Sequence, residues 1–289
     1  MEDTDNPSPA VQRRRLRTEL RRARIDAGLT QDAVASAMDW SLSKLIRIEN
    51  GSVSISTNDL KAILQHYKIN DEKRTAELLA LSRASRERSW WSTYRDSMYK
   101  RLIQLIEYEN AAYISRHYED LVIPGLLQTT DYMRVSTSQL APEMPAKQVD
   151  TVIEVRLKRQ ELLKRSDAPL LFFVLDEAVV RRIVGGKDVM LRQMQQLAEA
   201  ADMPNITVEV VPFSAGLLPG LQSPFVIHEF PDAADDDVLY LESPRGDLLS
   251  RDDADEILSF REDFERLRRA SLGPEGTIDF LSGVIAELS

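Results

Sequence analysis

The sequence predicts an α+β protein in which an all-α N-terminal domain is followed by a larger domain of helices and strands. Two observations support this prediction. Through the first third of the chain, apolar residues recur at helical spacing and a capping residue precedes each run. Beyond residue 107, strand-length apolar runs at 170–175 and 206–211 alternate with amphipathic stretches. With 289 residues, of which 43% are hydrophobic, the chain is long enough for about two domains.

The most informative segment, residues 29–51, predicts two short helices joined by a tight turn. In chain order the signals are a preceding helix stop at Gly28, an N-cap at Thr30 with the helix beginning at Gln31, a turn at Asp39 and Trp40, a second N-cap at Ser41, and a stop at Gly51. Leu45 and Ile48 face inward, at positions i and i+3. The outward face is therefore polar and basic, formed by Leu42, Ser43, Lys44, Ile46 and Arg47. This layout is typical of helix-turn-helix DNA readers.

Further helices flank this pair. A basic helix opens at residues 13–17 and directs Leu16, Leu20 and Ala23 inward. Thr57 is expected to cap a helix that buries Leu60, Ile63, Leu64 and Tyr67. Asp71 is expected to cap a further helix, which carries Leu78, Leu79 and Leu81.

This region resembles the XRE (lambda/434 repressor-like) helix-turn-helix family. The matching residues are Leu29-Thr30-Gln31, Ala35, Ser41, Ser43 and Ile48-Glu49-Asn50-Gly51, with the capped helix that follows. The resemblance implies a five-helix lambda-repressor-like domain whose third helix enters the major groove of duplex DNA. By position it implies phosphate contacts from Gln31 and Asn50, and base-edge contacts from Leu42, Ser43 and Arg47 with Lys44 beside them; Ser41 completes the expected DNA-binding set. The alternative is an ordinary helical hairpin with a basic face.

The charge distribution agrees with that division of labour. The formal net charge of −10 would alone argue against a nucleic-acid ligand. However, residues 1–105 carry +5 and residues 106–289 carry −15. A basic N-terminal third on an acidic body is the asymmetry expected if only that third meets DNA. The acidic part should repel the duplex and attract a basic or polar partner.

Composition also excludes several classes of protein. Cysteine is absent, which excludes disulfides and thiolate metal sites and is compatible with a reducing cytoplasm. No apolar run approaches the ~20 residues that span a bilayer, and the N-terminus lacks the pattern of a signal peptide. We therefore expect a cytoplasmic, nucleoid-associated protein with no membrane contact. We expect residues 1–11 to form a disordered tail.

The expected domains follow from these patterns. After the tail come the DNA-binding domain over residues 12–88, a helical junction over 89–106, and the acidic α+β domain over 107–289. Trp90 and Trp91 lie in the junction, where paired tryptophans either stack on a ligand or seal one domain against the next. Strands are expected at 170–175, 206–211, 225–230 and 238–241, the last two as a hairpin. Helices are expected at 108–118, 149–164, 177–184, 189–201, 253–270 and 278–288.

Catalytic motifs are nearly absent. A zinc peptidase needs His-Glu-x-x-His, whereas His66, His117 and His228 lie far apart in the sequence and each stands alone. The phosphate-binding Gly-x-x-x-x-Gly-Lys-Ser/Thr loop and the Gly-x-Ser-x-Gly elbow are both missing. Residues 185–187 are too short for a phosphate-binding loop and indicate a helix stop. Residues 235–237 indicate an exposed acidic loop rather than a metal site. We expect no enzymatic activity, no metal and no cofactor.

The second domain resembles the uncharacterised C-terminal domain of actinobacterial XRE regulators, among which are WhiJ-type developmental regulators. The matching phrases are residues 123–132 (IPGLLQTTDY), 156–160 (RLKRQ), 175–178 (LDEA) with Gly185-Gly186, and 208–213 (VEVVPF). The resemblance covers nearly the whole chain after residue 105. It implies a protein partner, because such regulators are commonly encoded beside a small acidic protein of the BldB-like kind.

A candidate partner-binding patch runs from residue 123 to residue 132, where a Pro-Gly turn precedes polar residues that we expect to be exposed. Its candidate residues are Pro124, Gln128, Thr129, Asp131 and Tyr132, with Arg156 and Arg159 facing them. In the alternative interpretation, Pro124-Gly125 only breaks a helix, and Leu126 and Leu127 belong to the core.

Two functions remain open at this point. The first is a dimeric, sequence-specific transcription regulator that binds paired half-sites and is controlled through its second domain by a small protein or a ligand. The second is an antitoxin-like interaction protein that binds a neighbour-encoded partner and regulates only its own promoter.

Overall fold

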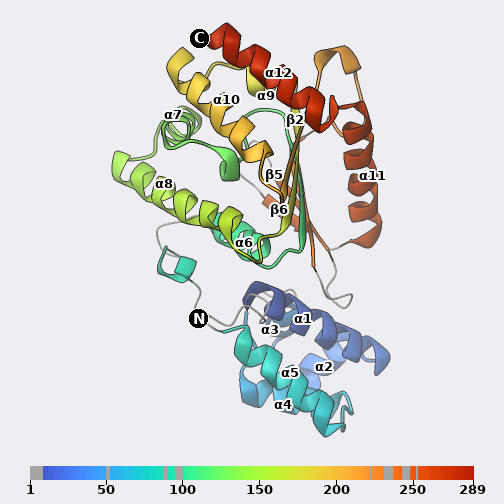
Figure 1. Ribbon diagram of the computed structural model, residues 1–289. Coiled ribbons are helices and arrows are strands. Elements are labelled where there is room, and N and C mark those ends of the chain that lie inside the picture. Colours follow the sequence, from blue (N-terminus) through green and yellow to red (C-terminus); the bar gives the residue numbers. More distant parts are fainter. Residues whose placement is uncertain are drawn as a thin grey trace. The chain divides into compact units, whose positions relative to one another are not determined.

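The computed structural model describes residues 9–49, 53–86, 90–94, 100–221, 223–230, 237–242, 248–251 and 253–289 (Figure 1). The chain forms two compact units, residues 1–92 and 93–289, which we describe separately. The boundary falls inside the stretch expected to be a junction. The first unit is helical and the second combines helices with a sheet, so the predicted α+β class is confirmed.

The described part of the first unit forms the five expected helices. These are α1 (Pro9–Asp26), α2 (Gln31–Ala37), α3 (Leu42–Glu49), α4 (Thr57–His66) and α5 (Glu72–Ala84), followed at the boundary by the 3-10 turn η1 (Trp90–Tyr94). The hydroxyl groups of Thr30 and Ser41 accept backbone N–H bonds from Ala33 and Lys44, as their predicted capping roles require.

Two helix starts differ from the sequence prediction. Helix α1 begins at Pro9, so residues 9–11 are helical rather than part of a tail. Proline suits a first helical turn, because its missing N–H would have no intrahelical partner there. Helix α4 is capped by Ser56, which accepts from the N–H of Asp59, and Thr57 is its first helical residue.

One apolar core joins all five helices. It contains Leu16 and Leu20 of α1, Val34 and Ala35 of α2, Leu45 and Ile48 of α3, Leu60, Ile63 and Leu64 of α4, and Leu78 of α5. These residues recur at three- and four-residue spacing, which is why the sequence alone predicted the inward face of each helix. The core fixes α3 on a packed support.

The second unit contains a sheet and the helices that cover it. In chain order its elements are α6 (Lys100–Glu109), β1 (Ile114–Glu119), η2 (Gly125–Leu127), α7 (Thr130–Leu140), α8 (Ala146–Gln160), η3 (Glu161–Lys164), β2 (Leu170–Asp176), α9 (Glu177–Arg181), α10 (Lys187–Ala201), β3 (Ile206–Val211), η4 (Phe213–Ala215), β4 (Phe225–Glu229), β5 (Val238–Glu242), β6 (Leu248–Arg251), α11 (Ala254–Ala270) and α12 (Gly273–Leu288).

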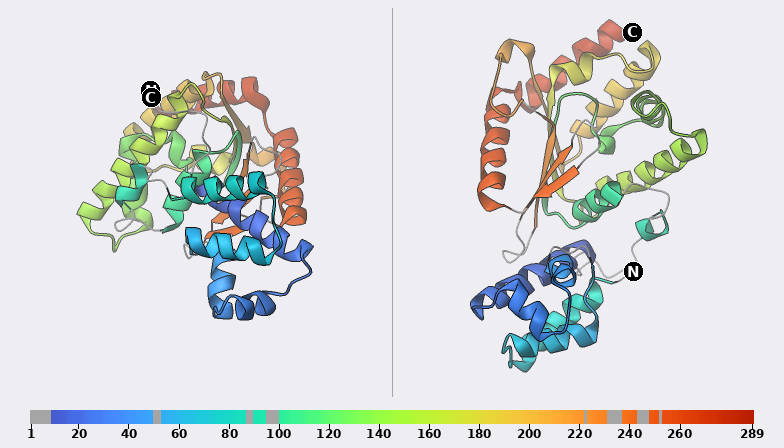
Figure 2. Two further views of the ribbon diagram at one scale, coloured as in Figure 1. Left: turned by 90° about the horizontal axis from the view of Figure 1, so that it is seen from below. Right: turned by 180° about the vertical axis from the view of Figure 1, so that it is seen from behind.

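The sheet is mixed, with the strand order β3-β2-β1-β4-β5-β6. Strands β1, β2 and β3 are parallel, whereas β4, β5 and β6 pair antiparallel and include the expected hairpin. Helix α11 covers one face, and α10 and α12 pack on the other, where α6 also lies against β4 and β5 (Figure 2). Each strand in the middle of this sandwich is buried on both faces.

Two strands were missed by the sequence analysis. Strand β1 was predicted as part of a helix over residues 108–118, but α6 ends at Glu109 and the chain then becomes extended. Its buried face carries the polar residues Ser115 and His117, so the alternation of apolar and polar residues that marks a strand is hidden. Strand β6 lies at the sheet edge and has only four residues.

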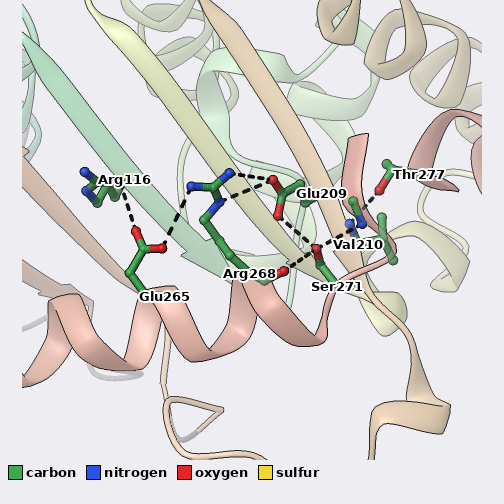
Figure 3. A network of polar contacts seen from close by, with 8 residues as sticks. Arg116, Glu209, Val210, Glu265, Arg268, Ser271 and Thr277 are labelled. Atoms are coloured by element: carbon green, nitrogen blue, oxygen red, sulfur yellow. Dashed lines mark hydrogen bonds and ion pairs between the residues drawn. The ribbon is translucent and has the colours of Figure 1, made fainter. Parts of the chain in front are cut away.

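The edge strand β3 is covered by the first turns of α12 and the residue that precedes them. The N–H of Val210 donates to the hydroxyl of Thr277 at 3.0 Å, and its carbonyl accepts from the N–H of Leu272 at 2.9 Å (Figure 3). Beside them, the buried carboxylate of Glu209 accepts bonds from Arg268 and Ser271 (Figure 3). These contacts occupy the backbone groups at Val210, which would otherwise be open to pairing with another chain.

Candidate nucleic-acid interface

Helix α3 presents one face to the core and the opposite face to solvent. Leu45 and Ile48 are buried, at 0% and 4% exposure. Leu42 and Ile46 are 41% and 39% exposed, and Ser43 and Arg47 are also exposed. A short helix held on a packed core with its outward side chains free has the dimensions to enter the major groove of B-DNA.

Arg47 and Lys44, which lie three residues apart on this helix, are in different states. Arg47 extends from the exposed face, and no hydrogen bond or ion pair joins its side chain to another residue in the described part of the chain. Lys44 is half-buried. Its ammonium group lies 3.2 Å from a carboxylate oxygen of Asp59 and 3.9 Å from the centroid of the Trp40 ring. The two cations of α3 are therefore not equally available to a ligand.

A buried ionic cluster ties α3 to the two helices before it. Arg24 of α1 donates two bonds to the carboxylate of Glu49, Nε to Oε1 at 2.7 Å and Nη2 to Oε2 at 3.0 Å. Gln31 at the start of α2 donates a third, at 2.7 Å. The hydrogen bond to Glu49 raises the pKa of Arg24 above its ordinary value. Satisfied on all sides, Glu49 fixes the C-terminal end of α3 against α1 and α2.

Gln31 was predicted to contact phosphate, and the structure places its amide on Glu49 instead. The phosphate contact remains a prediction, because one N–H and the amide oxygen of Gln31 have further hydrogen-bonding capacity. Ser41 caps α3, so its hydroxyl serves the helix end. Asn50, the other predicted phosphate contact, and the helix stop at Gly51 lie outside the described residues.

The turn between α2 and α3 passes through a left-handed residue. Asp39 has φ = 55°, a conformation that aspartate tolerates better than most side chains other than glycine. The backbone reverses here because the N–H of Trp40 donates to the carbonyl of Ala35 at 2.8 Å.

The candidate partner patch of the second unit is largely internal. Gln128, Thr129 and Asp131 were expected to be exposed, but Gln128 is buried, as are Pro124, Tyr132 and Arg159. Thr129 and Arg156 are half-buried, and Asp131 alone among the seven is exposed. The prediction that Gln128 is exposed is therefore wrong, and the alternative interpretation of Leu126 and Leu127 as core residues is confirmed.

Backbone groups explain why these polar side chains lie inside. The chain from Ile123 to Thr129 has little regular structure, so its buried N–H and C=O groups need side-chain partners. Gln128 donates to the carbonyl of Ile123, Gln160 donates to that of Gln128, and Gln193 bonds both Leu127 and Thr129. These glutamines therefore hold the 123–129 segment in place.

Arg159 forms a second internal contact of this kind. It makes a two-bond ion pair with Glu109 of α6, and both side chains are buried. A Cβ atom on Gly125 would lie only 3.1 Å from Nη1 of Arg159, so the glycine leaves room for the guanidinium.

A histidine pair was missed by the sequence analysis, which treated the histidines as isolated. His117 of β1 and His228 of β4 both bond the hydroxyl of Ser115, at 3.0 Å and 2.8 Å, and all three residues are buried. Burial lowers the pKa of His117 well below its ordinary value, and the charges of His228 and Arg159 act in the same direction. The residues are brought together by the β1–β4 pairing across more than 100 positions of sequence.

No group of three or more metal-ligating side chains occurs among the residues that the structure describes. Asp235 and Asp236 lie outside them, and Asp237 is ion-paired with Arg261. Within the same described ranges, no helix has both the length and the apolar character needed to cross a membrane.

Comparison with known proteins gives two family matches. The family described as "Helix-turn-helix domain" matches residues 15–78, which span α1 to α5 up to Leu78. The family described as "Domain of unknown function (DUF5753)" matches residues 102–283, which cover most of the second unit. No match was found among curated proteins or among solved structures.

Proposed function

The chain belongs to the DUF5753 family and carries a helix-turn-helix domain before it, and from this premise we propose that it is a sequence-specific, dimeric transcription regulator. One observation supports this most directly: α3 exposes Leu42, Ser43, Ile46 and Arg47 from a helix that is packed and ionically fixed on its other side. A rigid helix with an accessible polar face can contact base edges without the entropic cost of becoming ordered on binding.

The charge of the two units supports the same division of labour. Residues 1–105, which contain the whole first unit, carry +5 and residues 106–289 carry −15, so only the N-terminal part of the chain gains free energy from releasing counterions at a duplex. The second unit then serves control and association rather than DNA contact. In this proposal, a protein partner or a ligand exerts the control. The chain is an XRE regulator of the WhiJ-like type, it acts in the cytoplasm, and it catalyses no reaction.

The antitoxin-like alternative differs in what is bound and where. It requires a tight partner encoded beside this chain and a single DNA site at its own promoter. The net charge of −15 on residues 106–289 disfavours a small acidic partner of the BldB-like kind, unless that partner meets a local basic surface. Genome-wide mapping of the bound sites separates the two functions, because the regulator should occupy several promoters.

The direct test is a selection of duplex DNA by the full-length protein. We expect enrichment of one motif with two half-sites, and an affinity for that duplex that falls linearly with the logarithm of salt concentration. Several phosphate contacts would give a steep slope, about −0.9 for each phosphate neutralised. Failure to enrich any motif, together with no salt-sensitive binding to duplex DNA, would contradict the proposed function.

A further inference from the structure

The two cations of α3 are arranged differently, and this difference bears on how the helix would discriminate between sequences. Lys44 contacts Asp59 of α4 and the ring of Trp40 at the same time. Asp59 lies in the first turn of α4, where a carboxylate is favoured by the helix dipole. Both partners of Lys44 therefore belong to the packed first unit, and each has a structural reason to be where it is.

Unspecific affinity for DNA comes mainly from cations that reach phosphates, whereas specificity comes from side chains that read base edges. A lysine three residues from Arg47, on the flank of the reading helix, has the reach to bind phosphate on any sequence. The carboxylate of Asp59 and the face of the Trp40 ring both hold the ammonium group of this lysine. The face that would meet the duplex is left with Arg47 as its available cation.

We propose that Asp59 is a specificity-determining residue, which restrains Lys44 from phosphate contacts so that discrimination depends on Arg47. The inference rests on the proposed DNA binding. It predicts that neutralising Asp59 strengthens binding to unrelated sequences more than binding to the selected one. The protein gains a phosphate contact and loses part of its preference.

The test compares the full-length protein with its Asp59→Asn variant on two duplexes, the selected one and one of unrelated sequence. One added phosphate contact should make the slope of log affinity against log salt steeper by about 0.9 on the unrelated duplex. Between 50 and 200 mM salt, this corresponds to a further loss of roughly threefold for the variant. The ratio of specific to unspecific affinity at low salt should fall by a similar factor.

Removing a negative charge strengthens binding to DNA even when no lysine is released, so a second background is needed. In Lys44→Gln, the Asp59→Asn change should no longer steepen the slope, because the released cation is absent. The matched control is Glu77→Gln on α5, which removes one of the two carboxylates paired with Arg74 and changes the net charge equally. This variant should leave the slope on both duplexes unchanged.

Helix α4 could be weakened by Asp59→Asn, since Asp59 follows the N-cap Ser56 by three residues. Asp59→Gln is the second variant, because glutamine at that position can still bond back to the helix start. The inference is overturned if both variants keep the wild-type slope and specificity, or if they steepen the slope equally in the Lys44→Gln background. If wild-type protein binds no duplex at all, the proposed function fails instead, and the two failures are thus distinct.

Discussion

Arg47 is the residue on which the proposed sequence reading depends most. Its side chain is exposed on α3, one position before the buried Ile48. An arginine in the major groove binds most favourably to O6 and N7 of guanine through two parallel bonds. Arg47→Ala should therefore weaken binding to the selected duplex by about 1–3 kcal/mol and relax the preference at one base pair.

This prediction is checked by repeating the DNA selection with Arg47→Ala, with Arg83→Ala on the exposed surface of α5 as the control. Gln31→Ala should behave differently and weaken all sequences evenly, since Gln31 bonds Glu49 and is expected to face the backbone of the duplex. An unchanged consensus for Arg47→Ala would show that this residue reads no base.

The buried ion pair of Arg159 and Glu109 gives a prediction about stability. Arg159→Met would leave the carboxyl group of Glu109 buried and without its partner inside the second unit. We expect the free energy of unfolding to fall by about 3–5 kcal/mol, and the double variant Glu109→Leu/Arg159→Met to recover most of that loss. Urea denaturation followed by far-UV circular dichroism measures both, with the exposed Lys158→Met as control. A single variant within about 1 kcal/mol of wild type would contradict the prediction.

His117 should make the second unit sensitive to acid. Its pKa in the folded protein lies well below the value of 6.5 that it has when unfolded, because burial disfavours the charged ring. The unfolded chain therefore binds more protons below about pH 6.5, and the free energy of unfolding should decrease as the pH falls from there toward the folded-state pKa. Above that window, His117 adds no pH dependence.

The measurement is denaturant unfolding between pH 5 and pH 8 for wild type and for His117→Asn. The variant should lose part of the slope below pH 6.5, whereas His66→Asn in the first unit should keep the pH dependence of the second unit. Equal slopes for wild type and His117→Asn would contradict the assignment. The sequence could not have predicted this pair, because the two histidines meet only through strand pairing.

At the scale of elements, the turn before α3 gives a prediction about backbone strain. Asp39 occupies the left-handed region, where a β-branched side chain costs about 1–2 kcal/mol and glycine costs nothing. Asp39→Val should therefore destabilise the first unit by that amount, and Asp39→Gly should leave it unchanged or more stable. Both variants remove the carboxylate, so their difference isolates the backbone effect.

Fluorescence measures this effect selectively, because all three tryptophans, Trp40, Trp90 and Trp91, lie in the first unit. If the two Asp39 variants unfold at the same denaturant concentration, the positive φ does not strain the turn.

Elements were predictable where local signals agree with packing. The caps at Thr30, Ser41 and Asp71 and the helical spacing of the apolar residues placed α2 to α5. Strand β2 was found because its apolar run is bounded by Pro169 and Asp176. Strand β3 was found because apolar and polar residues alternate along it. Strand β1 was mistaken for a helix, since its buried positions hold Ser115 and His117, whose hydrogen-bond partners are each other and His228 of a distant strand. Local pattern cannot reveal a polar residue that another part of the chain makes acceptable.

The same limit applies to the candidate patch in the second unit. A Pro-Gly turn followed by polar residues is typical of an exposed loop, and the sequence therefore favoured a contact surface around Gln128. The fold instead uses Gln128, Gln160 and Gln193 to satisfy the backbone of an internal irregular segment. By contrast, the outward face of α3 was predictable, because a single helix on a core determines it.

At the scale of the whole molecule, each unit has its own apolar core. The core of the first unit lies between residues 16 and 78, and the two larger cores of the second unit lie between residues 118 and 288. Separate cores allow a control signal in the second unit to change the association of two chains without unfolding the reading helix. Binding can shift that association only by its different affinity for the two states.

The last prediction concerns that association. One short helix contacts only a few base pairs, and paired readers gain specificity by occupying two half-sites about 10 base pairs apart, on the same side of the duplex. We expect the full-length protein to bind the selected duplex as two copies on an inverted repeat. In each copy residues 106–289, which carry −15, are kept away from the phosphates. Sedimentation of the complex gives the number of copies. Inserting five base pairs between the half-sites turns them to opposite sides and should abolish cooperative binding, whereas inserting ten should restore part of it. A complex of one copy, unaffected by either insertion, would contradict the dimer and leave the reading by α3 intact.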